Sequence, residues 1–308
     1  MSRIVIAEFM DEGAVAQLAK SHEVFYDPTL VDDIPRLTSA VANTDALIVR
    51  NRTQVRGQLL TAMSQCRVVG RLGVGLDNID LSGCESQGIQ VIPATGANAL
   101  SVAEYVISTA LLLLRGSFQS THLVAQGLWP RSNLSNGREI RGKKMGLIGF
   151  GSIGQLTASL AKNVGMEVVA FDSVMPETHP AFRQHGVQFV EFDNLVAMSD
   201  VISLHIPLLP STKGLFDKRT LSSMKSDAVL INTSRGEIVD EECLAEALKT
   251  NKLGGAAIDV FGIEPLPISP HFIDCPNLLL TPHIAGVTTE SNKRVSFLVA
   301  EKVLEALQ

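Results

Sequence analysis

Three spaced glycines, Gly149, Gly151 and Gly154, constrain this chain more than any other feature of its sequence. They follow a short apolar stretch that begins at Gly146, and they precede a helical pattern that runs to Asn163. In a G-x-G-x-x-G pattern the first glycine permits a tight turn, the second lets the backbone approach a ligand, and the third lets helix and strand pack closely. Because the free amides at a helix N-terminus attract phosphate groups, the pattern predicts a site for the pyrophosphate of a dinucleotide.

A second apolar stretch, residues 167–171, ends at Asp172. An acidic residue about 20 positions after the glycines, at a strand end, is placed to accept hydrogen bonds from the adenosine ribose. Its charge would repel a 2′-phosphate, and residues 173–179 contain no arginine or lysine to receive one. The local sequence therefore predicts NAD rather than NADP as the cofactor.

The bulk composition excludes several classes of protein. A chain of 308 residues is long for one hydrophobic core, which favours two domains. Its 26 basic and 32 acidic residues give a net charge of −6, which argues against nucleic acid or an anionic membrane as a partner. The four cysteines form no C-x-x-C pair, so we expect neither a metal site nor disulfides. With no signal peptide or membrane span expected, the predicted location is the cytoplasm.

Short apolar strands alternate with helical patterns along the whole chain, which predicts parallel sheets with right-handed crossovers. The expected fold class is α/β, with two doubly wound parallel-sheet domains, one flavodoxin-like and the other a Rossmann domain around the glycines. We expect the closing helix, about 290–307, to return to the first domain. The predicted domains are thus 1–98 plus 287–308, and 99–286.

Residues 98–115 read as one long, largely apolar helix between the two α/β regions. Such a helix is either a packed connector or part of a subunit interface, and both readings stay open. We expect a homodimer. Residues 116–141, which contain the one tryptophan, Trp129, are polar and predicted to be irregular.

Polar side chains follow the predicted strands of the second region, where an open parallel sheet binds its ligands. They are Asp172, His205, Arg235, Asp259, Glu264 and His283. A guanidinium at Arg235 suits a carboxylate ligand, although a surface arginine at the sheet edge is the alternative. Histidine suits proton transfer near neutral pH, and Glu264 is placed to orient His283; the alternative is a buried histidine satisfied by backbone groups.

Four ordered segments, residues 146–154, 232–237, 259–265 and 281–286, resemble the D-isomer-specific 2-hydroxyacid dehydrogenases in sequence and spacing. Residues 71–80 also resemble the first-domain signature of that family, so the resemblance covers essentially the whole chain. Small departures are Gly262 and Ile263, where acidic residues are common, and Ala285, where many relatives have glycine. None of them affects the residues expected to carry the chemistry.

The resemblance implies a role for each matching residue. Arg235 matches the arginine that binds the substrate carboxylate, His283 the acid/base, and Glu264 its carboxylate partner. Asp259 matches a residue near the nicotinamide amide, and no metal is implied. The implied cofactor-binding residues are Gly149, Gly151, Ser152, Ile153, Gly154, Asp172, His205, Pro207, Thr233, Ser234, Arg235, Asp259, His283 and Gly286.

Two arginines, Arg50 and Arg52, lie two positions apart after an apolar strand. On an extended segment they would face the same way. One arginine can bind a carboxylate, and two suggest a second anionic group at C3, a phosphate or sulfonate; the alternative is that one of them pairs with a surface acid. The expected substrate-binding residues are Arg50, Asn51, Arg52, Gly73, Val74, Gly75, Arg235 and His283.

Within the family, this arginine segment resembles the phosphoglycerate dehydrogenase branch. The chain ends at Gln308, directly after the closing helix, so we expect none of the C-terminal regulatory domains that many members of that branch append. As a short chain with this arginine pair, it also resembles the (S)-sulfolactate dehydrogenases, which implies NAD-dependent conversion of (S)-sulfolactate to 3-sulfopyruvate. The alternatives are oxidation of 3-phosphoglycerate and reduction of glyoxylate or hydroxypyruvate.

Two functions of other classes share part of the pattern. A NAD-sensing binding protein, like the corepressors related to this family, could keep Arg235, Glu264 and His283 without turning over a substrate. A methyltransferase can use a glycine turn and a strand-end acid for S-adenosylmethionine, but it does not explain the later arginine and histidine motifs. Hydride transfer followed by NADH absorbance separates the three.

Overall fold

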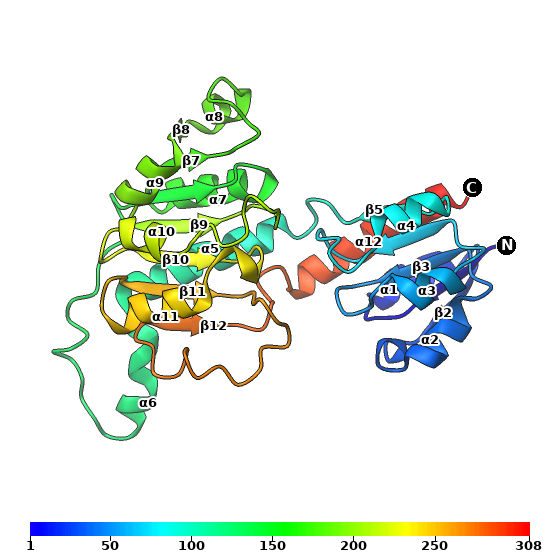
Figure 1. Ribbon diagram of the computed structural model, residues 1–308, viewed down its shortest axis with the longest axis horizontal. Helices are drawn as coiled ribbons and strands as arrows, with labels where there is room; N and C mark the ends of the chain where they lie inside the picture. The colour runs from blue at the N-terminus through cyan, green and yellow to red at the C-terminus, as the bar shows by residue number, and fades with distance from the viewer. The chain divides into compact units, whose positions relative to one another are not determined.

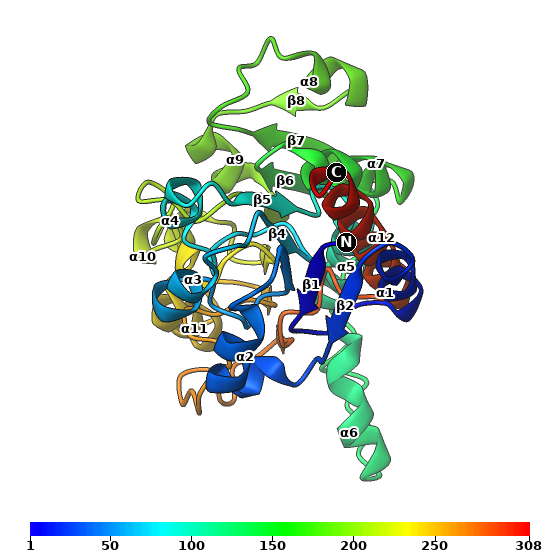
Figure 2. The ribbon, with the colours of Figure 1, turned by 90° about the vertical axis from the view of Figure 1, so that its right-hand side faces the viewer.

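The computed structural model describes residues 1–308, which divide into two compact units (Figure 1). Unit 1 is Met1–Asn98 with Val287–Gln308, and unit 2 is Ala99–Gly286. Each unit is built on one parallel sheet with helices on both faces (Figures 1 and 2). The two sheets confirm the predicted α/β fold class.

The sheet of unit 1 has five parallel strands in the order β2-β1-β3-β4-β5, the flavodoxin-like order. They are β1 (Arg3–Ile6), β2 (Glu23–Tyr26), β3 (Ala46–Val49), β4 (Val68–Arg71) and β5 (Gln90–Pro93). β3 is fully buried, as its unbroken apolar sequence requires for a central strand of a parallel sheet. The strand order reverses between β1 and β3, and open parallel sheets bind ligands outside the carboxyl ends of their strands at such a point.

The helices of unit 1 are α1 (Glu12–Ala19), α2 (Ile34–Val41), α3 (Gly57–Ala62), α4 (Leu81–Ser86) and α12 (Thr289–Ala306), with a 3-10 turn η1 (Leu30–Asp32). α1 and α12 share one core with the sheet, and α2, α3 and α4 share the other. A Cβ added at Gly70 in β4 would lie 2.7 Å from Val299 in α12, so this glycine lets the closing helix reach the sheet. The six-residue helix α3 was not expected.

The sheet of unit 2 has seven parallel strands in the order β12-β11-β10-β9-β6-β7-β8. They are β6 (Lys144–Ile148), β7 (Glu167–Phe171), β8 (Gln188–Phe189), β9 (Val201–Leu204), β10 (Val229–Asn232), β11 (Gly255–Ile258) and β12 (Leu278–Leu280). Six of them follow the dinucleotide-binding order, with β12 added at one edge. The order reverses between β6 and β9, directly beside the glycine turn.

The helices of unit 2 are α5 (Ala99–Arg115), α6 (Ser120–Ala125), α7 (Ser152–Asn163), α8 (Pro180–His185), α9 (Phe192–Met198), α10 (Lys218–Ser223) and α11 (Glu241–Lys249), with 3-10 turns η2 (Ser117–Gln119) and η3 (Gly236–Ile238). α5, α7 and α8 pack on one face of the sheet, and α9, α10 and α11 on the other. The prediction of an irregular segment at 116–141 was wrong in part, because it contains η2 and α6. α6 projects away from the sheet (Figures 1 and 2).

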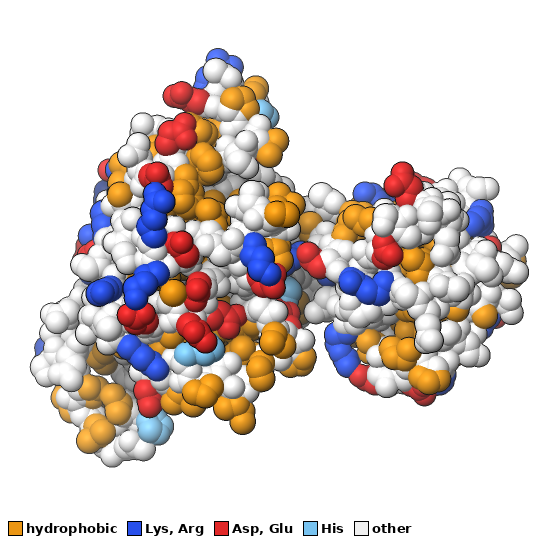
Figure 3. Space-filling model, in the orientation of Figure 1, with side chains coloured by type: hydrophobic (Ala, Val, Ile, Leu, Met, Phe, Trp, Pro, Cys, Tyr) orange, Lys and Arg blue, Asp and Glu red, His pale blue; other side chains and the backbone are white.

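No single helix is long and apolar enough to cross a membrane. The pair Ala99–Arg115 and Ser117–Ala125 is long and apolar enough only when the two are taken together, and it is bent by 71° at the break between them. On the face of unit 2 drawn in Figure 3, basic and acidic side chains are interspersed, without a large field of one sign. This mixture matches the modest net charge of −6.

Candidate active site

The glycine turn lies at the switch point of the unit 2 sheet, between the end of β6 and the start of α7. Gly149 has φ of 93°, and a Cβ there would lie 2.3 Å from the carbonyl oxygen of His205. A Cβ on Gly154 would lie 2.3 Å from the Gly149 oxygen. By contrast, a Cβ on Gly151 would meet nothing within 4 Å. The first and third glycines are therefore demanded by packing, while the second faces open space that suits a pyrophosphate.

The N-terminus of α7 faces the same space. Gly151 is the N-cap and no side chain caps the helix, so the first amides, those of Ser152 and Ile153 among them, are not used by a capping side chain. A helix N-terminus of this kind attracts phosphate through its free N–H groups and its dipole. This geometry fits the dinucleotide predicted from the sequence.

Asp172 holds the turn after β7 and also contacts the glycine loop. Its Oδ2 accepts a hydrogen bond from Phe150 N (2.8 Å), and its Oδ1 accepts from Val174 N (2.9 Å) and Met175 N (3.0 Å). Carboxylate oxygens have further lone pairs, so these bonds orient the side chain while leaving it able to accept from a ribose hydroxyl. Its predicted role in selecting NAD stays a prediction.

Buried polar atoms without partners lie at the carboxyl ends of β9 and β10. Both ring nitrogens of His205 and the Oγ1 of Thr233 are shielded from solvent with no hydrogen-bond partner. Burial lowers the pKa of His205 to about 4, so its ring is neutral at neutral pH. Since buried polar groups are nearly always satisfied, these atoms fit the bound dinucleotide that the sequence predicts here.

Two other predicted cofactor residues are used within the protein. The Oγ of Ser234 donates to the Leu204 carbonyl at 2.6 Å, which ties the end of β10 to β9. Pro207 is exposed, and its carbonyl accepts from Thr212 Oγ1 at 2.7 Å. Gly286 closes unit 2 and is half-buried.

His283 and Glu264 form a direct pair, as the sequence predicted. Nδ1 of His283 lies 2.7 Å from Oε2 of Glu264, whose Oε1 accepts from Phe261 N at 3.0 Å. Burial raises the pKa of Glu264, but the hydrogen bonds from His283 and Phe261 outweigh it, so the pKa lies below its usual value. With Nδ1 engaged by Glu264, Nε2 is the nitrogen left to exchange a proton with a substrate.

His283 has φ of 56°, a left-handed conformation that is uncommon for a non-glycine residue and is concentrated at functional sites. Its backbone N donates to the Asp259 carbonyl at 2.8 Å. The Asp259 carboxylate, 1% exposed, accepts from Ile284 N and Ala285 N, both at 2.8 Å. Asp259 thus fixes the loop that carries His283, in addition to any role near the cofactor.

Two residues that were not predicted from the sequence, Thr281 and Tyr105, extend this network. Thr281 Oγ1 lies 2.6 Å from Asp259 Oδ1 and also 2.6 Å from the hydroxyl of Tyr105 in α5. Burial raises the pKa of Asp259, although the hydrogen bonds from Thr281, Ala285 and Ile284 oppose the shift. The one available signal was the polar Thr281 inside a recognised motif; nothing pointed to Tyr105.

Arg235 follows β10, and its loop is fixed by Asn232. The Asn232 side chain donates to the Arg235 carbonyl (2.9 Å) and accepts from Ser234 N (3.0 Å), and Arg235 Nη1 donates to the Ser234 carbonyl (2.6 Å). A Cβ on Gly236 would lie 1.9 Å from the carbonyl carbon of Phe261. The loops of Arg235 and Glu264 therefore pack backbone against backbone, and the positive charge of Arg235 helps to lower the pKa of Glu264.

The predicted substrate arginines lie in unit 1. The expectation of an extended segment was wrong: β3 ends at Val49, and residues 51–53, Asn51 among them, form bends. Arg50 Nη2 donates to Asn292 Oδ1 at 2.8 Å, whereas Arg52 is exposed and forms an ion pair with Asp32. The two guanidinium groups thus have separate partners, because bends replace the pleat that would align them.

Gly73, Val74 and Gly75 follow β4, with Val74 38% exposed. A Cβ on Gly73 would lie 1.8 Å from Nη1 of Arg71, so the glycine makes room for this guanidinium. Arg71 Nη1 donates to the Leu72 carbonyl at 2.9 Å. In the sequence, Arg71 lies within the 71–80 segment, and no local pattern marks it as a site residue.

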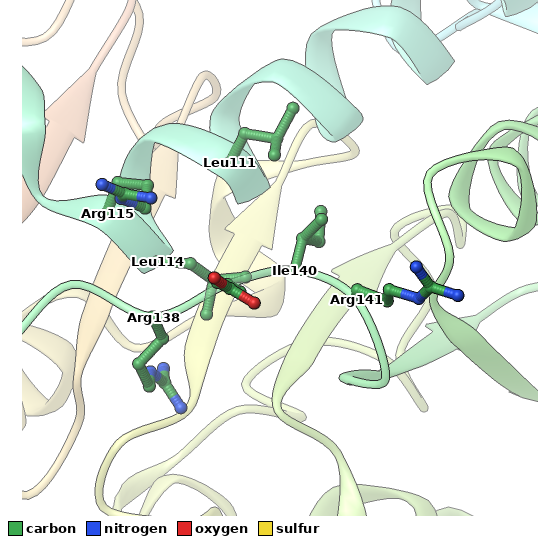
Figure 4. A pocket seen from close by; sticks show the side chains of 7 residues that line it. Leu111, Leu114, Arg115, Arg138, Ile140 and Arg141 are labelled. Atoms are coloured by element: carbon green, nitrogen blue, oxygen red, sulfur yellow. The ribbon is translucent and has the colours of Figure 1, made fainter.

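A cavity of about 310 Å3 lies in unit 2, at the C-terminal end of α5 (Figure 4). Arg138 on its wall pairs with Asp227 at 2.6 Å. The lining residues are Leu111, Leu114, Arg115, Arg138, Glu139, Ile140 and Arg141. None of them is a predicted catalytic, cofactor or substrate residue.

The chain is similar to known proteins in sequence and in fold. The family model "D-isomer specific 2-hydroxyacid dehydrogenase, NAD binding domain" matches residues 107–285. The (S)-sulfolactate dehydrogenase of Chromohalobacter salexigens is 47% identical over 308 residues, 100% of this chain and 99% of the relative. The D-3-phosphoglycerate dehydrogenase of Mycobacterium leprae is 36% identical over 99% of this chain, which spans 56% of that longer protein. The solved structure of NAD-dependent formate dehydrogenase from Staphylococcus aureus in complex with NAD has a TM-score of 0.83 and 29% identity, and covers 100% of this chain and 95% of its own.

Proposed function

Because the chain belongs to the D-isomer-specific 2-hydroxyacid dehydrogenases, whose cofactor is NAD, we propose that it interconverts (S)-sulfolactate and 3-sulfopyruvate. The observation that supports the reaction is the 2.7 Å contact between His283 and Glu264, whose loop packs against the loop of Arg235. The observation that supports the substrate is the likeness to a relative of that activity along its full length.

Arg235 binds the substrate carboxylate. Its planar guanidinium matches the two carboxylate oxygens, and its position after β10 places it at the ligand edge of the sheet. The Asn232 side chain bonds to the backbone of both Ser234 and Arg235, which fixes the backbone from which the Arg235 side chain extends. This preorganisation reduces the entropy lost when substrate binds.

His283 moves the proton. When (S)-sulfolactate is oxidised, neutral His283 removes the hydroxyl proton as C2 loses its hydride; when 3-sulfopyruvate is reduced, the imidazolium returns the proton to the oxygen. The nicotinamide cofactor, when bound, would accept the hydride as NAD+ in the oxidation and supply it as NADH in the reduction. Charged Glu264 on Nδ1 stabilises the imidazolium and fixes which nitrogen faces the substrate.

The anionic group at C3 is bound by Arg50, with Arg52 adding charge nearby. Arg50 is half-buried, and burial lowers its pKa, with the charge of Glu8 opposing the shift. A partly desolvated guanidinium is a stronger anion ligand than one in bulk water. Asn51 and the backbone of residues 73–75 complete the proposed substrate contacts.

The proposed binding and catalytic roles are distributed over both units. Unit 1 contributes the substrate residues just described, and unit 2 binds NAD and carries Arg235, Glu264 and His283.

The protein acts in the cytoplasm as a homodimer, with α5 and α6 in the interface. Support comes from the exposed Val124, Leu128 and Trp129, of which Trp129 is 77% exposed, and from the apolar side chains gathered around α6 in Figure 3.

Oxidation of 3-phosphoglycerate is the second candidate. It is favoured by the similarity to the phosphoglycerate dehydrogenase of Mycobacterium leprae over 99% of this chain. A phosphate ester and a sulfonate both present a tetrahedral anion to a guanidinium, so residue 50 alone does not distinguish them.

A substrate panel tests the proposal. Initial rates of NAD reduction are measured with (S)-sulfolactate, 3-phosphoglycerate, D-glycerate, D-malate and D-lactate, and the reverse rates with the corresponding 2-oxo acids. We expect the highest kcat/KM for (S)-sulfolactate. A higher kcat/KM for 3-phosphoglycerate would establish the second candidate. An equal kcat/KM for D-lactate and (S)-sulfolactate would show that the enzyme does not recognise an anionic group at C3.

A further inference from the structure

The buried acid Glu8 lies at the switch point of the unit 1 sheet. It follows β1 by two positions, and β1 neighbours β3, which Arg50 directly follows. The order of the five strands reverses between these two strands, and ligands of open parallel sheets bind outside the carboxyl ends at such a point. Glu8 and residues 50–53 therefore follow the two strands that flank this switch point.

Glu8 directs its hydrogen bonds to backbone amides of that segment. Oε1 accepts from Arg50 N (2.8 Å) and Thr53 N (3.0 Å), and Oε2 accepts from Arg52 N (3.3 Å). Glu8 is 4% exposed, and a buried charge is tolerated only when it is hydrogen-bonded. Both oxygens act as acceptors, which a carboxylate can do and an amide cannot.

Asn78 holds the same segment from its carbonyl side. Its Nδ2 donates to the carbonyls of Arg50 (2.9 Å) and Thr53 (2.7 Å), and it is 6% exposed. Residues 51–53 belong to no helix or strand, so two buried side chains supply the hydrogen bonds that regular structure would otherwise provide. The segment is fixed before any ligand arrives.

The position of this segment decides where Arg50 places its charge. Arg50 Nη2 donates to Asn292 Oδ1 (2.8 Å), and its guanidinium carbon lies 5.6 Å from the ring centre of Phe9. A negative charge beside a site for an anion is unfavourable by itself, so Glu8 needs a role that outweighs this repulsion. Its three bonds to the backbone supply that role.

We propose that Glu8 is a positioning residue of the substrate site: its carboxylate fixes the 50–53 segment so that Arg50 meets the anionic group of the substrate. The proposal rests on the proposed function in one respect, namely that Arg50 binds substrate. Glu8 touches neither substrate nor cofactor, and it sets affinity and selectivity rather than the hydride or proton step.

The test compares Glu8→Gln with wild type. Gln keeps the size of Glu but turns one acceptor into a donor that faces an N–H group. We expect KM for 3-sulfopyruvate to rise about tenfold or more, since hydrogen bonds to a charged group are lost, with kcat within about twofold and the Kd of NADH unchanged. KM for pyruvate, which has no C3 anion, should change less.

The control is Asp45→Asn. Asp45 lies in the same unit, directly before β3, and so at the opposite end of that strand from residue 50. Its carboxylate accepts a hydrogen bond from Arg3 N at 2.7 Å. Its loss removes a carboxylate bound to a backbone amide without touching residues 50–53, so the KM of Asp45→Asn should stay at the wild-type value. An equal rise in KM for Asp45→Asn would overturn the proposal, because any weakening of unit 1 would then suffice.

Glu8→Asp separates position from charge. Asp keeps the negative charge but is shorter, so it cannot reach all three amides, and its KM should also rise. A wild-type KM for Glu8→Asp beside a raised KM for Glu8→Gln would show that charge alone matters and would refute positioning. Asn78→Asp, which removes the donor on the carbonyl side, should raise KM in the same way.

Hydrogen exchange gives a readout that needs no substrate. In wild type the amides of Arg50, Arg52 and Thr53 should be protected, and in Glu8→Gln they should exchange faster while the amides of β3 do not. Fast exchange of all three in wild type would overturn the proposal even if a variant fails to fold. If wild type does not reduce 3-sulfopyruvate, the proposed substrate is wrong, and the same variants are assayed with the 2-oxo acid that wild type reduces fastest; an unchanged KM for that acid would overturn the role of Glu8.

Discussion

Glu264 reaches His283 from a separate loop, and their side chains meet at 2.7 Å between Oε2 and Nδ1. The pKa of Glu264 is lowered on balance, so the carboxylate is charged at neutral pH. A charged partner on Nδ1 favours the imidazolium over the neutral ring. The pair is thus suited to a histidine that alternates between acid and base.

Replacing Glu264 by Gln should shift the pH dependence of both directions. Without the negative charge of Glu264, the imidazolium is stabilised less relative to the neutral ring. Reduction, which needs the imidazolium, should then lose rate at a lower pH, and oxidation, which needs the neutral ring, should gain rate at a lower pH. Profiles of kcat/KM against pH check this, with Glu246→Gln, remote on α11, as the control; superimposable profiles would separate Glu264 from the proton step.

Replacing Gly236 by Ala should damage the site through the backbone. The added Cβ would lie 1.9 Å from the Phe261 carbonyl carbon, so the loop carrying Glu264 must move. We expect a loss of about 1–3 kcal/mol in the free energy of unfolding and a lower kcat. Gly262→Ala is the matched control, because a Cβ there would meet nothing closer than 3.7 Å. Equal stability of the two variants would contradict the close packing of these loops.

Replacing Asp172 by Ala should weaken the preference for NAD. The carboxylate that repels a 2′-phosphate is lost, together with its hydrogen bonds to Phe150, Val174 and Met175. We expect KM for NAD to rise and the ratio of kcat/KM for NAD over NADP to fall about tenfold or more. Glu177→Ala, an exposed acid on the same loop, should leave the ratio unchanged. A ratio that stays constant in Asp172→Ala would mean that another residue selects the cofactor.

The two arginines of unit 1 should differ in their effect. Arg50→Gln removes the half-buried guanidinium and should raise KM for (S)-sulfolactate about tenfold or more, with less effect on D-lactate. Arg52→Gln should act in the same direction but less, because this exposed side chain already pairs with Asp32. Michaelis constants for the two substrates check this. Equal effects on lactate and sulfolactate would show that neither arginine recognises the C3 group.

Much of unit 2 could be predicted because local rules determine it. The glycine turn needs its three glycines for steric reasons that the sequence displays directly, and His283 and Glu264 follow or flank strands of one parallel sheet. The strand order was not predicted strand by strand, but the alternation of strands and helices already required two parallel sheets.

The remainder depends on contacts between distant residues. Tyr105 and Thr281 are 176 positions apart and join only when α5 packs on the sheet, so no local pattern could pair them. The directions of Arg50 and Arg52 depend on a bend fixed by Glu8, which is 42 positions from Arg50. Short elements such as α3 and β8 carry too few residues for a periodic pattern.

The central claim is that His283 transfers the substrate proton in a NAD-dependent dehydrogenase. The most direct measurement is kcat for 3-sulfopyruvate reduction by His283→Ala, with the Kd of NADH measured on the same sample. The account predicts that kcat falls by about two to four orders of magnitude while the Kd of NADH stays close to the wild-type value. A kcat within a few-fold of wild type would contradict it.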